Sequence, residues 1–286
     1  MVVTDGPVTT TETRPSSALG ITLLVLAEVL VLNTALGPLG AGLLTLPVTE
    51  TMGNQLTGLE LVSALLVAPL ATIAGVGALR GHRAAPSLGF AVGGYCAFMF
   101  VPYVVGPGRD GYAVAPLVHI ALFGLGFAVT ALAWRSADPD RMPPLTARRR
   151  ALGALLLVLA AFVLSRYIPA LIGGIKGGGP LPAEYTDAPG FFWSIFMLDL
   201  GIVVPGTAAV GIALLRGKAS ARPALYAIVA WFALVLPAAA VMAVLMVVKH
   251  DPHASNGQTI VFVAVAVVYL VIAVTISRPL YGPQRS

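Results

Sequence analysis

Charged side chains are scarce in this chain: they make up 10% of its 286 residues, whereas 58% of the residues are hydrophobic. Soluble globular proteins carry about 25% charged residues, and disordered chains combine low hydrophobicity with high charge. Neither class fits this composition. The mean hydropathy of +0.91 instead predicts an integral membrane protein whose main partner is the lipid bilayer.

Cysteine is almost absent, because Cys96 is the one cysteine of the chain. This excludes an intrachain disulfide and a thiolate metal cluster. His250, Asp251 and His253 lie close together, but nothing completes a metal shell around them. We therefore expect no metal and no cofactor. The net charge is +5, yet no base-stacking or groove-reading element accompanies the basic residues, so nucleic acid is not a predicted partner.

Long apolar runs dominate the rest of the chain. A helix needs about 20 mainly apolar residues to cross a bilayer. The sequence contains eight such runs, at residues 18–38, 58–79, 86–106, 113–134, 151–174, 191–215, 222–248 and 258–277. They are apolar on all sides and do not alternate as the strands of a membrane barrel do. We predict an all-α, polytopic bundle of eight transmembrane helices.

The basic residues predict how this bundle is oriented. If the N-terminus lies in the cytoplasm, the outside segments carry only Arg109, Lys176 and Lys249, and nearly all other basic residues are inside. Because cytoplasmic segments are enriched in Lys and Arg, we expect both termini to be cytoplasmic and the protein to lie in the plasma membrane. We also expect cytoplasmic tails at residues 1–17 and 279–286, the first of them disordered.

The two halves of the chain resemble each other around a cytoplasmic linker at residues 136–150. Pro69 precedes Arg80 by the same spacing as Pro205 precedes Arg216, and a glycine follows each arginine. One explanation is shared loop chemistry, since Arg-Gly after a span satisfies both orientation and helix ending. We favour a parallel 4+4 internal repeat of residues 18–135 and 151–278, in which sites tend to form between the halves.

Ionisable residues inside the predicted spans mark a candidate site. Each one costs about 2.5–3.5 kcal/mol on insertion scales, so such residues usually pair or line a cavity. Four of them fall in the outer half of the membrane by helical rise: Glu28, His119, Arg166 and Asp199. We predict a substrate- or ion-binding site from these four residues, with Glu28 as the proton-linked acid and Arg166 paired with Asp199. Alternatively, Arg166 and Asp199 form a structural ion pair, and His119 is a packing residue.

Glu60 is a secondary candidate, because it lies only about 3 Å below the outer start of its predicted span and is expected to reach the headgroups. Glycines at Gly93-Gly94 and at Gly124 and Gly126 are expected to permit close helix contacts.

Two segments carry a family resemblance. Residues 53–63 read GNQLTGLELVS and precede Pro69, and residues 198–205 read LDLGIVVP. Both are similar to a pattern in an uncharacterised family of bacterial multispanning membrane proteins with no assigned function. The resemblance covers most of the chain after the tail, although related chains often carry Asp where this chain has Glu60. It implies an eight-helix fold and supplies no substrate.

Two functions remain open from the sequence. The first is a transporter of a small solute or ion, with its polar site between the halves and a proton as a candidate coupling ion. The second is a non-transport scaffold, sensor or assembly partner whose intramembrane charges are structural. We do not expect an enzyme, because clustered His or acidic residues and nucleophile motifs are missing. The sequence predicts neither the substrate nor the oligomeric state.

Overall fold

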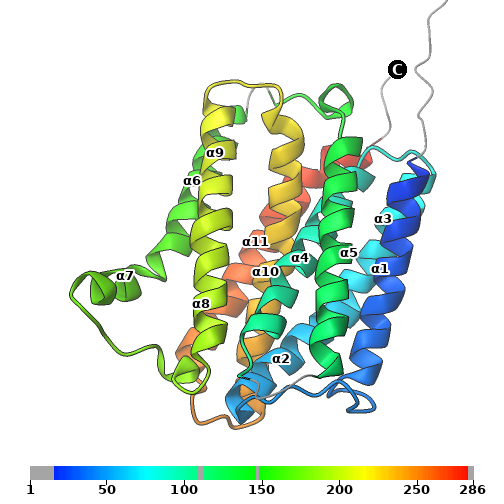
Figure 1. Cartoon of the computed structure of the whole chain (residues 1–286). Coiled ribbons are helices and arrows are strands. Elements are labelled where there is room, and N and C mark those ends of the chain that lie inside the picture. The colour runs from blue at the N-terminus through cyan, green and yellow to red at the C-terminus, as the bar shows by residue number, and fades with distance from the viewer. Residues whose placement is uncertain (1–15, 109–112, 146–147, 283–286) are drawn as a thin grey trace, which may run out of the picture.

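The structure, a computed structural model, describes residues 16–108, 113–145 and 148–282. Within these residues every regular element is a helix, and the long helices pack as one bundle (Figure 1). This confirms the predicted all-α polytopic fold. Residues 1–15 of the first predicted tail, residues 283–286 of the second and residues 146–147 of the linker lie outside the described residues. The helices that cross in one piece are α1 (Ser17–Leu36), α4 (Ala85–Val105), α5 (Val114–Ser136), α10 (Ala221–Val248) and α11 (Asn256–Tyr281).

Three further spans are interrupted. One consists of α2 (Glu50–Val62), the π-helical turn η1 (Ser63–Val67) and α3 (Ala68–Leu79), and another consists of α8 (Pro189–Leu198), the π-helical turn η4 (Asp199–Val203) and α9 (Val204–Leu215). The third bends by 51° between α6 (Arg149–Ser165) and α7 (Ile168–Ile175). The described chain thus has seven helices able to cross a membrane, or eight if the bent pair is one span.

Proline explains the two π-helical turns. Pro69 and Pro205 each lie in the first turn after the widened segment, and a proline both lacks an amide hydrogen and clashes with the carbonyl four residues earlier. In response the amide of Ala68 donates to the carbonyl of Ser63, and that of Val204 donates to the carbonyl of Asp199, each five residues back. The helices therefore continue past their prolines at the expense of one widened turn.

Close glycine crossings also recur in both halves. A Cβ added to Gly20 of α1 would lie 3.0 Å from the carbonyl oxygen of Gly75 in α3. A Cβ added to Gly153 of α6 would lie 2.9 Å from the carbonyl oxygen of Gly211 in α9. The pairs α1–α3 and α6–α9 thus share one local geometry, as a repeat requires. The duplication itself stays a prediction.

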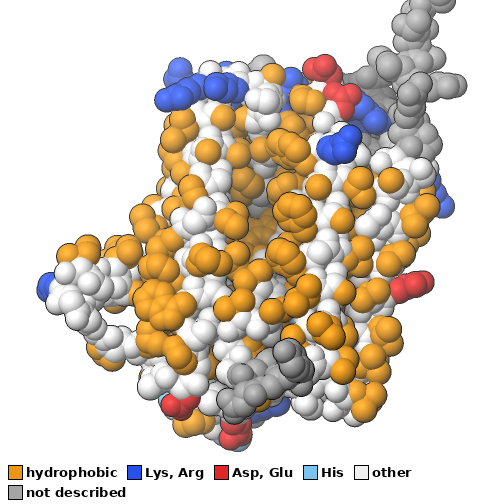
Figure 2. All heavy atoms as spheres, viewed as in Figure 1, with side chains coloured by type: hydrophobic (Ala, Val, Ile, Leu, Met, Phe, Trp, Pro, Cys, Tyr) orange, Lys and Arg blue, Asp and Glu red, His pale blue; other side chains and the backbone are white. Residues whose placement is uncertain are grey.

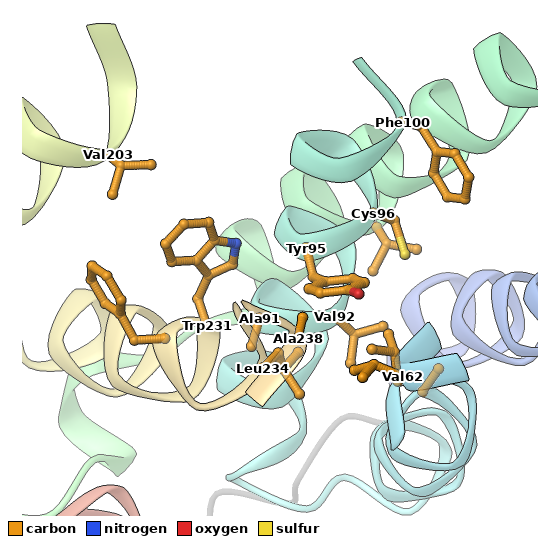
Figure 3. Close-up of a cluster of buried hydrophobic side chains, with 14 of the residues drawn as sticks. Val62, Ala91, Val92, Tyr95, Cys96, Phe100, Val203, Trp231, Leu234 and Ala238 are labelled. Carbon is orange, nitrogen blue, oxygen red and sulfur yellow. The ribbon is translucent and has the colours of Figure 1, made fainter. Parts of the chain in front are cut away.

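The core that joins the halves lies between α4 and α10 (Figure 3). Tyr95 and Cys96 of α4 are fully buried, and Trp231 and Leu234 of α10 are almost so. Helix α10 also packs against α2, where a Cβ on Gly58 would lie 2.8 Å from the Cα atom of Met242. This close backbone approach leaves little freedom in how α2 and α10 are positioned.

Basic side chains gather at the end of the bundle where the described chain begins and ends, here called the basic face (Figure 2). There Arg83 donates to the carbonyls of Pro279, Leu280 and Gly282, at distances of 2.6 to 2.9 Å. The carbonyls of Pro279 and Leu280 belong to the last turn of α11, and Gly282 directly follows this helix. The last carbonyls of a helix have no amide partners within it. The guanidinium also complements the negative helix end. The opposite end, with the α1–α2 and α10–α11 loops, is called the distal face.

The predicted span limits need correction at three places. Helix α2 begins at Glu50 and not at residue 58, because Thr49 caps it and accepts a hydrogen bond from the Met52 amide. The polar residues of its first turns face the protein interior, so hydropathy excluded them. The span 151–174 is broken after Ser165. Helix α11 continues to Tyr281, beyond the predicted tail boundary at 279.

The glycine contacts of α5 yield a stability test. A Cβ on Gly126 would lie 2.8 Å from the Ala97 amide nitrogen and 2.9 Å from the Gly93 carbonyl oxygen, whereas one on Gly124 would meet nothing within 4 Å. We expect Gly126→Ala to lower the free energy of unfolding by about 1–3 kcal/mol, because the opposing backbone must move. The control Gly124→Ala, on the same helix, should be neutral or slightly stabilising. Thermal unfolding of both variants measures the difference, and equal melting temperatures would contradict the expected crossing.

Candidate functional site

A cavity of about 90 Å³ lies near the distal face, next to the break between α6 and α7. We call it the Arg166 cavity. Helix α2 contributes Gln55, the α10–α11 loop contributes His253, and the 3-10 turn η3 (Ala183–Tyr185) contributes Glu184 and Tyr185. The remaining wall comes from α10, the loop residue Ser255 and α11. It includes Met242, Met246, Ser255, Gln258, Thr259 and Phe262.

The helix break exposes Arg166 to this cavity. Pro169 has no amide hydrogen to donate to the carbonyl of Ser165, so the α-helical pattern fails there. The amides of Arg166 and Tyr167 instead donate to carbonyls three residues back, at 3.3 and 3.0 Å. This tighter turn ends α6, and α7 then leaves the bundle with none of its residues buried (Figure 1).

Two aromatic rings lie near the guanidinium of Arg166, which is an exposed residue. Its Cζ atom lies 5.7 Å from the ring centroid of Phe262 and 5.9 Å from that of Tyr167. These distances fall within the range of cation–π attraction. The rings stabilise the cation and leave its N–H donors available to a ligand.

The predicted ion pair between Arg166 and Asp199 is not formed. No guanidinium nitrogen of Arg166 lies within 4.0 Å of a carboxylate oxygen of Asp199. The hydroxyl of Tyr167 instead donates to Oδ2 of Asp199 at 2.5 Å. The tight turn explains the difference, because it directs Arg166 toward α11 and the next residue toward η4. Tyr167 is therefore a site residue that the sequence analysis missed. Its position beside Arg166 within a span was the available signal.

The other predicted residues lie elsewhere. Glu28 is exposed on the outer surface of α1, between exposed apolar residues such as Val25 and Val31, so the structure does not bring it to Arg166. His119 is buried in α5, where its ring stacks on Phe100 and meets the edge of Tyr103. Of the four predicted residues, only Arg166 and Asp199 share one neighbourhood.

Glu60 also departs from its expected place. Because α2 begins ten residues earlier, at Glu50, Glu60 lies about 15 Å into the helix. Its side chain is 4% exposed, so it does not reach the headgroups as a surface residue would. It belongs to the interior of the first half, apart from the Arg166 cavity.

A clasp at Asp251 holds the α10–α11 loop beside the cavity. Oδ2 of Asp251 accepts from Asn54 at 2.8 Å, and Oδ1 accepts from Thr51 at 3.1 Å and from the His253 amide at 2.9 Å. Burial raises the pKa of Asp251, but these hydrogen bonds outweigh it and the pKa is lowered overall. The His-Asp-Pro-His segment thus ties the loop to α2, and the described residues contain no cluster of three metal-ligating side chains.

No family model, no curated protein and no solved structure matches this chain. The helices are long and apolar enough to make it a multi-pass membrane protein. Any narrower function must be argued from the chemistry of the cavity, because no relative supplies an analogy.

The clasp predicts a pH-dependent contribution to stability. A carboxylate with a lowered pKa stabilises the folded state above its unfolded value of about 3.9, and this contribution is lost as pH falls through the folded pKa. We expect Asp251→Asn to cost about 1–3 kcal/mol at neutral pH, because donors that faced a carboxylate lose their acceptor. Melting temperatures of wild type and variant should begin to converge below pH ~4 and meet only below the lowered folded pKa.

The control for this experiment is Asp187→Asn, which changes an exposed carboxylate in another distal loop. It should leave the melting temperature unchanged at neutral pH. A difference between wild type and Asp251→Asn that stays constant down to pH ~3 would argue against an ionised, hydrogen-bonded Asp251.

Proposed function

We propose that this protein is a plasma-membrane carrier that takes a small solute with one carboxylate or other oxyanion from the outside into the Arg166 cavity. The observation that carries the proposal is the guanidinium of Arg166, which lines a cavity and forms no ion pair among the described residues. A buried pair of Arg166 and Asp199 would have favoured a purely structural role. The proposal identifies the distal face with the outside.

The donors around the cavity support an anionic group. A guanidinium offers five N–H donors in a planar fork that matches an oxyanion. Burial raises the pKa of Tyr185 to about 12, although Arg166 opposes part of this rise, so its hydroxyl is protonated at neutral pH. The amides of Gln55 and Gln258 line the same space. Together these groups provide neutral and charged donors to one ligand.

The other residues that line the cavity restrict which solutes can bind. Glu184 brings a negative charge to the cavity, which disfavours a dianion and suits either a monoanion or a zwitterion with an ammonium group. Met242, Met246 and Phe262 form an apolar portion, where a short hydrocarbon side chain can pack. The volume of about 90 Å³ suits a small metabolite.

The position of the cavity is typical of transporters. Many of them bind substrate beside a discontinuous helix, between internal repeats. Here the span containing α6 and α7 is broken at Arg166, and the lining combines α2 of the first predicted repeat with elements of the second. The predicted 4+4 repeat is part of this proposal, supported by the matching glycine crossings and π-helical turns.

An assembly partner is the second candidate function. A groove of about 290 Å³ between α6 and α11 is lined entirely by apolar residues, among them Leu155, Leu159 and Val268. Another helix could pack there, and exposed apolar surface on α11 extends the same side. This candidate requires no ligand at Arg166, so ligand binding separates the two functions.

A ligand-stability screen tests the carrier. We expect small monocarboxylates or α-amino acids to raise the melting temperature of the purified wild type, because a ligand that binds the folded state stabilises it. Arg166→Gln should weaken binding by ten- to a hundredfold, since charge-assisted hydrogen bonds contribute about 1.5–3 kcal/mol. Lys176→Gln, which changes an exposed cation at the end of α7, is the matched control. A ligand that stabilises Arg166→Gln as well as wild type would rule out this cavity.

The orientation is testable by cysteine labelling. Cys96 is fully buried, so a new surface cysteine is the reactive one. We expect Asn256→Cys, at the exposed distal start of α11, to react with a membrane-impermeant maleimide on intact cells. Ser220→Cys, exposed on the basic face, should react only after lysis. The reverse pattern would invert the proposed topology.

A further inference from the structure

A groove of about 850 Å³ opens at the basic face, where α3 turns into α4 beside the end of α11. The α3–α4 turn contributes Arg80, His82 and Arg83 to its wall, and the end of α11 contributes Tyr281 and Gly282. No Asp or Glu of the described chain lines it. The polar end of the groove thus offers positive charge and N–H donors without an acidic neighbour in its wall.

A tight turn presents these side chains. Gly81 has a φ of 69°, a conformation that costs little only for glycine, and the His82 amide donates to the carbonyl of Gly77 at 2.8 Å. This glycine motif ends α3 and allows α4 to begin at Ala85. Arg141 donates to the Gly81 carbonyl at 2.9 Å. These contacts hold the turn in one conformation before any ligand binds.

Two side chains of the turn remain available to a ligand. Arg83 is used in part, because it donates to the carbonyls at the end of α11. Arg80 is exposed, and its guanidinium forms no ion pair or hydrogen bond with other described residues. The ring of His82 stacks on Tyr281, and its Nδ1 accepts from the Ala84 amide at 3.2 Å. A neutral His82 ring therefore carries its proton on Nε2, which is a donor.

The acidic residues of the neighbouring linker do not neutralise Arg80. Asp138 and Asp140 belong to the region of the 3-10 turn η2 (Pro139–Arg141), where Oδ1 of Asp138 accepts from the Asp140 amide. Neither residue lines the groove, and neither forms an ion pair within 4.0 Å. The charge of Arg80 is thus without a carboxylate partner in the described part of the chain.

The groove continues from its polar end along the apolar sides of two helices. Ile73 and Val76 of α3 and Leu88 of α4 line it, and Ile73 is 59% exposed. Ile73 precedes Arg80 by seven residues, which places it about 10 Å further along the helix axis. Gly77 lies between them and has no side chain to fill the groove. A free phosphate would use only the polar end, whereas a phospholipid would use the whole length.

We propose that this groove binds an anionic phospholipid from the leaflet that contacts the basic face. The phosphodiester accepts hydrogen bonds from Arg80 and His82, and an acyl chain packs along the apolar side chains of α3 and α4. Basic pockets between membrane helices on the cytoplasmic side suit anionic headgroups, and the exposed ring of Tyr281 is typical of the lipid–water interface. A choline headgroup would find no carboxylate in the described lining. The inference does not rest on the proposed carrier.

The test adds phosphatidylglycerol or phosphatidylcholine, with the same acyl chains, to the purified full chain in detergent. We expect phosphatidylglycerol to raise the melting temperature in a saturable manner and at a lower mole fraction than phosphatidylcholine, because a ligand of the folded state stabilises it. Arg80→Gln should raise the mole fraction needed for half of this effect about fivefold. Arg80→Lys keeps the charge and should retain most of the affinity. The position is exposed, so both variants should fold.

Arg216→Gln is the matched control. Arg216 follows α9 as Arg80 follows α3, and it is exposed, but it does not line the groove. Its response to phosphatidylglycerol should equal that of the wild type. Equal responses of the wild type to the two lipids, or equal responses of Arg80→Gln and Arg216→Gln, would overturn the inference. Full stabilisation by glycerol 3-phosphate without lipid would identify a site for a free phosphate group and would also overturn it.

Discussion

A proline in a membrane helix removes a backbone hydrogen bond that lipid cannot replace, and the three interrupted spans of this bundle each carry a proline at or just after the interruption. At Pro69 and Pro205 the helix absorbs the loss by widening one turn. At Pro169 it does not, and the span breaks between α6 and α7. The break presents Arg166 to a cavity and Tyr167 to Asp199, while Asp199 itself begins a widened turn. The polar chemistry of the second half is thus concentrated where the regular helix is disturbed, as is common at functional sites.

Helix α2 connects the polar regions of the molecule. Its first turns hold the α10–α11 loop through Asn54 and Asp251, its next residue Gln55 lines the Arg166 cavity, and Glu60 lines a separate crevice. The close approach of Gly58 to Met242 fixes this helix against α10. The same helix therefore lines both the Arg166 cavity and the crevice.

Several features of the fold and of the site could be predicted from the sequence. Apolar length alone identified the spans, since only helices satisfy their backbone within lipid. The close contact of Gly93 and Gly126 was also foreseeable, because small residues allow helices to approach. The start of α2 was not, since buried Thr51, Asn54 and Gln55 count as polar in any hydropathy window. The partner of Asp199, Tyr167, could not be predicted either. A break in a helix changes the directions of its side chains, and the spacing of residues in the sequence does not show by how much.

By itself, the sequence determined the class of the protein and its approximate spans, because hydrophobic length depends only on local chemistry. The tertiary structure decided which of the ionisable residues meet. A helix that is apolar on every side carries no mark of the face that packs inward, so Glu28 and Asp199 look alike in the sequence. Only packing turned the first toward the outer surface of the bundle and the second toward Tyr167.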